Sequence, residues 1–205
     1  MRKRVALGAI PVGMAILGMA GSQVAAARPA AETGTASTVP DVTVLFGRAV
    51  TKIRSTTRPT YARAVVLEAD GITAGGRCTP FGCSGGRGTT SASGFVSWRF
   101  VFNNASWTRF KSATLTYGPP PKAFGPVRGF KESFAGDVNI PRAPRMTLSQ
   151  AVALLRSAGH RAKFFNVTLR NPLGPKRLNP QYIFGFDHNE YFAVDTVTKK
   201  VRPFS

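Results

Sequence analysis

Residues 95–102 read FVSWRFVF, and this stretch decides the fold because its side chains alternate in character. One face of the extended chain is apolar and consists of Val96, Trp98, Phe100 and Phe102. The opposite face carries Ser97 and Arg99. Such alternation is typical of an antiparallel strand with one buried face. Because the aromatic side chains share the face away from Arg99, we expect them in a core and not stacked on nucleic-acid bases, so we do not expect nucleic acid as a partner.

Other strand-like runs surround this stretch. They are rich in β-branched and aromatic residues and are bounded by glycine, proline and asparagine, as strands often are. Together with the first stretch they cover residues 62–69, 95–102, 111–117, 162–169, 182–186 and 191–195.

Two amphipathic segments predict helices. In the first, over residues 42–54, apolar residues recur at four-residue steps after Asp41, a suitable N-cap. In the second, over residues 147–158, Thr147 and Gln150 have the spacing of a capping box, and Gly159 is a suitable C-cap.

The order of these elements is helix, strand, strand, strand, and it occurs twice. We therefore predict an α+β fold of two tandem α-β-β-β units, with antiparallel sheets that are each covered by one helix. The units would span residues 41–117, including a Cys- and Gly-rich loop at 71–94, and residues 146–205. A Pro-rich linker, residues 118–145, would join them through phenylalanines that lie against the core.

The second unit resembles the PepSY family. Residues 182–186 read YIFGF and residues 191–201 read YFAVDTVTKKV, which is similar to the aromatic strand and the Val-Asp-x-x-Thr-Gly-Lys-Val strand that end a PepSY domain. The preceding Ala- and Leu-rich helix extends the resemblance to residues 146–202, and residues 42–117 would be a degenerate second copy. Lys199 stands where that family usually has glycine. The resemblance implies a binding or inhibitory module, with a protease as a possible partner and no catalytic residues.

The N-terminus indicates export. Three basic residues at positions 2–4 precede an apolar run that ends in small residues, so residues 1–27 are predicted to be a signal peptide cleaved between Ala27 and Arg28. Residues 28–40 would follow as a flexible leader. The alternative is that this segment is not cleaved and remains as a membrane anchor. No later segment of the chain is apolar enough to span a bilayer. We expect a secreted, extracellular protein that could associate with the cell wall.

Charge is the strongest signal in the composition. The chain has 28 Lys and Arg residues against 9 Asp and Glu residues, a formal net charge of +19. Such a field attracts an acidic protein or an anionic cell-wall polymer. The alternative is that the charge is merely solvated, since the basic residues are dispersed along the chain.

Cys78 and Cys83 are five positions apart and are flanked by glycines. In an oxidising compartment this spacing predicts a disulfide, with a metal site or free thiols as alternatives. A metal site would need further ligands, and the chain has two histidines, so we predict neither a metal nor another cofactor.

No reaction centre can be assembled from the remaining residues, so no catalytic residue is assigned. Near carboxylate pairs occur at Glu68 with Asp70 and at Glu132 with Asp137, while His160 follows the second helix. These observations favour a secreted non-catalytic binding or inhibitory module with a basic surface. Two alternatives remain: a hydrolase that uses His188 with Asp187 or Glu190, and a wall-associated structural protein.

Overall fold

The computed structural model describes residues 39–204, apart from residues 57–60, 80–81, 105–109, 119–121, 175 and 177. The predicted signal peptide, its cleavage site at Ala27 and Arg28, and the predicted leader up to residue 38 lie outside this part of the chain. In the described ranges, no helix is both long and apolar enough to cross a membrane.

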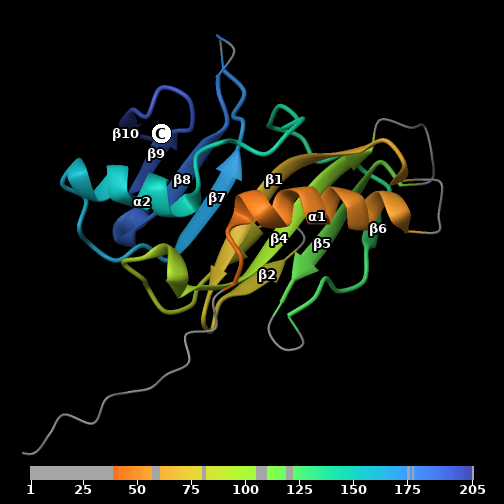
Figure 1. The fold of residues 1–205 in the computed structure, drawn as a ribbon, viewed down its shortest axis with the longest axis horizontal. Coiled ribbons are helices and arrows are strands. Elements are labelled where there is room, and N and C mark those ends of the chain that lie inside the picture. Colours follow the sequence, from red (N-terminus) through yellow and green to blue (C-terminus); the bar gives the residue numbers. More distant parts are fainter. Residues whose placement is uncertain are drawn as a thin grey trace, which may run out of the picture. The chain divides into compact units, whose positions relative to one another are not determined.

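A single antiparallel sheet dominates the described part of the chain (Figure 1). Its eight strands are, from one edge to the other, β10 (Val201–Pro203), β9 (Tyr191–Asp195), β8 (Gln181–Gly185), β7 (Asn166–Arg170), β1 (Ala64–Thr73), β4 (Phe95–Asn104), β5 (Ser112–Tyr117) and β6 (Arg128–Phe130). A separate hairpin is formed by β2 (Arg77–Thr79) and β3 (Gly82–Ser84).

The predicted fold class, two tandem α-β-β-β units with a sheet each, is wrong. β1 pairs with β7 from Glu68↔Arg170 to Ile72↔Asn166, so strands from both predicted units belong to one sheet. Without this pairing, each of these two buried strands would present an unpaired edge. Part of the predicted Pro-rich linker also joins the sheet, because β6 pairs with β5.

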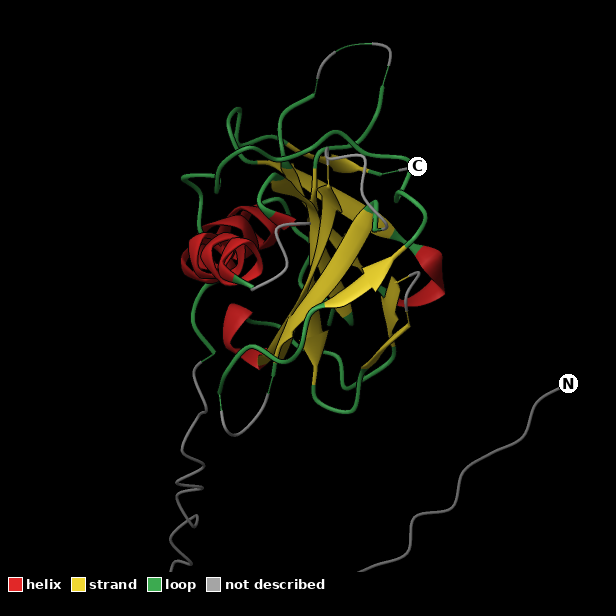
Figure 2. Cartoon of the chain, turned by 90° about the vertical axis from the view of Figure 1, so that its right-hand side faces the viewer, coloured by secondary structure: helices red, strands yellow, loops and turns green. Residues whose placement is uncertain are grey.

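Two α-helices, α1 (Val42–Ser55) and α2 (Leu148–Ser157), cover the same face of this sheet (Figure 2). Short 3-10 segments lie at η2 (Ala92–Gly94) and η3 (Asp187–Asn189). The capping box of Thr147 and Gln150 is present at the start of α2. Asp41 caps α1 through Oδ1, which accepts from the Thr43 amide at 2.9 Å, while Oδ2 accepts from the Leu148 amide at 3.0 Å. One carboxylate thus ties the beginnings of both helices together.

The hydrophobic core lies between the helices and the sheet. Trp98, Leu155 and Phe184 are all buried in it, and for Trp98 this confirms the alternation of residues 95–102. The strand prediction fails in one detail: Phe95, not Val96, belongs to the core. The pairing of β1 with β4 is irregular between Ile72 and Thr73, and a bulge of this kind reverses the face on which the next side chain lies.

Candidate functional site

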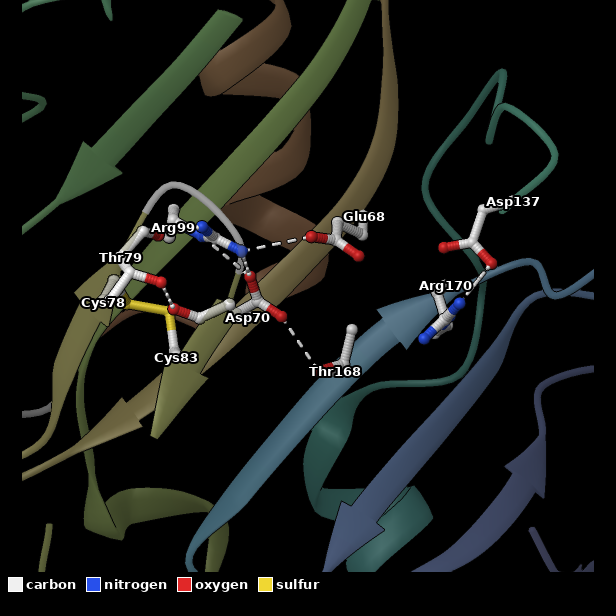
Figure 3. A network of polar contacts seen from close by, with 10 residues as sticks. Glu68, Asp70, Cys78, Thr79, Cys83, Arg99, Asp137, Thr168 and Arg170 are labelled. Carbon is white, nitrogen blue, oxygen red and sulfur yellow. Dashed lines mark hydrogen bonds and ion pairs between the residues drawn. A yellow bond between two sulfur atoms is a disulfide. The ribbon is translucent and has the colours of Figure 1, made fainter. Parts of the chain in front are cut away.

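The face of the sheet opposite the helices carries a row of polar side chains, which we call the charged network (Figure 3). β1 contributes Glu68 and Asp70, β4 contributes Arg99, and β7 contributes Thr168 and Arg170. Strand register brings them together, because Asp70 is opposite Arg99 on one side and opposite Thr168 on the other, and Glu68 is opposite Arg170. Directly paired side chains in antiparallel strands lie close enough to interact.

Arg99 is the centre of the charged network. Its Nε and Nη2 atoms donate to Asp70 Oδ2 at 2.9 and 2.6 Å, and Nη2 also donates to Glu68 Oε1 at 3.1 Å. The Thr168 hydroxyl donates to the other Asp70 oxygen at 2.8 Å. The side chains of Arg99 and Asp70 are 3% and 7% exposed, so both charges are almost fully removed from water.

A second ion pair lies beside the first. Arg170 donates through Nε and Nη2 to Asp137 Oδ1 at 2.9 and 2.7 Å. Burial raises the pKa of Asp137, and burial followed by the nearby Asp70 carboxylate raises the pKa of Glu68 to about 7. Glu68 therefore exchanges its proton near neutral pH, unlike an ordinary glutamate.

The β2–β3 hairpin lies against the charged network. Its cysteines, Cys78 and Cys83, are directly opposite each other and form the predicted disulfide. The hairpin is held to the sheet because Arg99 Nη1 donates to the backbone oxygen of Thr79. A disulfide is compatible with an extracellular location.

The charged network resembles a reaction centre in composition but not in geometry. Each of its carboxylates contacts an arginine or a hydroxyl group of the same network. The predicted carboxylate pair Glu68 and Asp70 is brought together, whereas Glu132 is exposed and Asp137 pairs with Arg170 instead. Sequence reasoning missed Arg99 as the centre, although a lone arginine on the polar face of an aromatic strand is a signal for it.

The histidine cluster considered for hydrolysis lies in an exposed turn. Asp187, His188, Asn189 and Glu190 connect β8 to β9, and all four are exposed. His188 and Asn189 have φ values of 57° and 59°, which the turn requires. The side chain of His188 forms neither a hydrogen bond nor an ion pair with Asp187 or Glu190. His160, by contrast, is half-buried, with its ring centroid 3.7 Å from that of Phe192.

A groove of about 1060 Å³ runs beside α2, and we call it the α2 groove. Its walls come from the outer side of α2, residues 138–146, the connection between β7 and β8 at Asn171 and residues 178–180, and the turn between β9 and β10. Much of the lining is apolar and includes Val138, Pro141, Pro144, Leu154, Leu178 and Val197.

The rim of the α2 groove is cationic. Arg142, Arg145 and Lys199 are exposed, and none of them has an ion-pair partner among the described residues. No aspartate or glutamate occurs among the described residues that line the groove. Lys199 has a φ of 61°, a left-handed conformation that glycine adopts more easily. The chain thus places a lysine at a backbone position that favours glycine.

The wall of the groove also contains an unmatched hydrogen-bond acceptor. Asn171 is 6% exposed, and its Oδ1 atom has no hydrogen-bond partner. A buried acceptor without a partner costs about 1–3 kcal/mol, so such atoms are uncommon in folded proteins. Sequence reasoning missed the groove because its residues come from four separate segments.

Three comparisons with known proteins found no match for this chain. No protein-family model, curated protein or solved structure matches it. Across the described residues, no group of three or more histidine, cysteine, aspartate or glutamate side chains could hold a metal ion.

Proposed function

We propose that the protein is a secreted, non-catalytic binding or inhibitory module, PepSY-like in its second half, that holds an anionic partner on its basic surface. The observation that carries this proposal is the α2 groove, whose cationic rim lacks ion-pair partners among the described residues. An acidic protein, such as a protease, or an anionic wall polymer would supply the missing charges.

The buried ion pair of Asp70 and Arg99 supports the non-catalytic part of the proposal. A general acid or base must be able to reach a substrate proton. Here Asp70 and Arg99 are buried and bound to each other, and the hairpin lies beside them. The groove, by comparison, is open and contains no carboxylate among its described lining residues.

The test is equilibrium binding of the purified protein to two probes, poly-L-glutamate and a glycerol phosphate polymer, at about 50 mM and about 300 mM salt. We expect binding at the lower salt concentration and a loss of about tenfold or more in affinity at the higher one, because salt screens exposed charges. An unrelated protein of similar size and net charge is the control. Failure to bind either probe at low salt, or binding no tighter than that of the control, would refute the proposal.

A further inference from the structure

We infer that the α2 groove binds a short acidic peptide segment that also carries apolar side chains. This inference rests on the proposed function and names the ligand class and the site. It follows from three properties of the groove: the composition of its walls, the charge of its rim and the fixed position of the wall formed by residues 138–146.

The composition of the walls favours a peptide over a wall polymer. The lining combines apolar side chains with the amide side chains of Asn139, Gln150, Asn171 and Asn179. Sites that bind organic ligands typically join apolar surface to a few placed polar groups. A polymer of phosphates and sugars would leave the apolar lining without a partner, whereas peptide side chains would cover it.

The charge of the rim selects for acidic residues. Arg142 and Arg145 lie on one wall and Lys199 lies in the turn between β9 and β10. A guanidinium group binds a carboxylate through two parallel hydrogen bonds, which adds geometric selectivity to the charge attraction. With no opposing carboxylate among the described lining residues, the rim repels basic peptides.

The wall formed by residues 138–146 is fixed before any ligand binds. Residues 138–146 are held in place by hydrogen bonds to β1, to β8 and to Asn171, the residue that follows β7. The Val138 amide donates to the backbone oxygen of Asn171 at 2.8 Å, and the Ile140 amide donates to the backbone oxygen of Val66 at 2.7 Å. The Tyr182 hydroxyl donates to the backbone oxygen of Met146 at 2.9 Å. A site that is already ordered loses little conformational entropy on binding.

The test begins with a displayed library of random dodecapeptides, selected on the purified full chain. We expect enriched sequences to contain aspartate or glutamate next to apolar residues. A fluorescent synthetic copy of one enriched peptide is then titrated against the wild type and against the double variant Arg142→Gln/Arg145→Gln. The double variant should bind about three- to tenfold more weakly, because two exposed ion pairs are lost.

Matched variants separate the groove from the general charge of the protein. Arg77→Gln/Arg87→Gln removes the same charge from two exposed positions near the β2–β3 hairpin, and it should change the affinity less than about twofold. Ala153→Phe fills the groove from an exposed position of α2 and should abolish peptide binding, whereas Thr51→Phe, at an exposed position of α1, should not. Thermal unfolding of each variant checks that the fold is intact.

Distinct outcomes would overturn the inference and the proposed function. Equal losses in both arginine variants, or full binding by Ala153→Phe, would show that the peptide does not occupy the groove. If the selection enriches no peptide but the protein still binds poly-L-glutamate or the glycerol phosphate polymer, the inference is refuted and the proposed function stands. Binding to none of these probes would refute both.

Discussion

The charged network and the α2 groove use the same kind of residue in opposite ways. Arg99 is 3% exposed and contacts two carboxylates, whereas Arg142 and Arg145 are exposed and have no carboxylate partner in the described part of the chain. A buried arginine whose charge is paired with carboxylates of the same chain is not available to bind an external ligand. A cation left without a partner at the surface contributes little to stability but remains available to a ligand.

The energetic difference between the two regions follows from solvation. Removing a guanidinium group from water costs several kcal/mol, and only close carboxylates and further hydrogen bonds offset this cost. Asp70, Glu68 and the Thr79 oxygen together supply those contacts to Arg99. Arg99 also joins β1, β4 and the β2–β3 hairpin, so we assign the charged network to folding and the groove to binding.

The substitution Arg99→Met tests this assignment with the largest expected effect. It leaves Asp70 buried without its cation, and breaking a buried pair in this way typically costs about 3–5 kcal/mol of the free energy of unfolding. Urea unfolding of the wild type and the variant measures the difference. The double variant Asp70→Leu/Arg99→Met, which removes both charges, should recover part of the loss. A loss below about 1 kcal/mol in the single variant would contradict the assignment.

The sequence predicted local features around the charged network but not the α2 groove. Alternation in residues 95–102 placed Trp98 and Phe100 in the core and Arg99 on the other face, and the spacing of Cys78 and Cys83 predicted the disulfide. These features depend on residues that are close together in the sequence. The two-residue period of a strand and the 3.6-residue period of a helix therefore predict them.

The arrangement of the sheet could not be predicted in the same way. Alternation shows which face of a strand is buried, but it does not show which strand is its neighbour, and so the pairing of β1 with β7 was missed. That pairing places Thr168 beside Asp70 and Arg170 opposite Glu68. The groove depends on the same long-range arrangement, because Arg142 and Lys199 are far apart in the sequence.

The pH dependence of stability should sharpen the comparison through Glu68. Its pKa is raised from 4.5 to about 7 in the folded state, so between these pH values the folded protein holds a proton that the unfolded chain releases. Rising pH therefore lowers the free energy of unfolding across this window, by on the order of 1–3 kcal/mol for this group. The raised pKa of Asp137 acts in the same direction from its ordinary value upward.

The substitution Glu68→Gln removes this proton exchange and keeps an oxygen that can accept from Arg99. Urea unfolding at several pH values between about 4.5 and 8 should show a flatter profile for the variant than for the wild type. Glu190→Gln, at an exposed position, is the control and should retain the wild-type profile. Parallel profiles for the wild type and Glu68→Gln would show that Glu68 does not titrate in this window.

The smallest effect on stability is expected where the effect on binding is large. Arg142→Gln/Arg145→Gln should change the free energy of unfolding by less than about 0.5 kcal/mol, because neither side chain has an ion-pair partner among the described residues. We expect any change to be a slight gain, since a chain of net charge +19 is destabilised by repulsion between its cations. Urea unfolding measures the change. A loss of more than about 1 kcal/mol would mean that these arginines, like Arg99, serve the fold, and the distinction between the two regions would then fail.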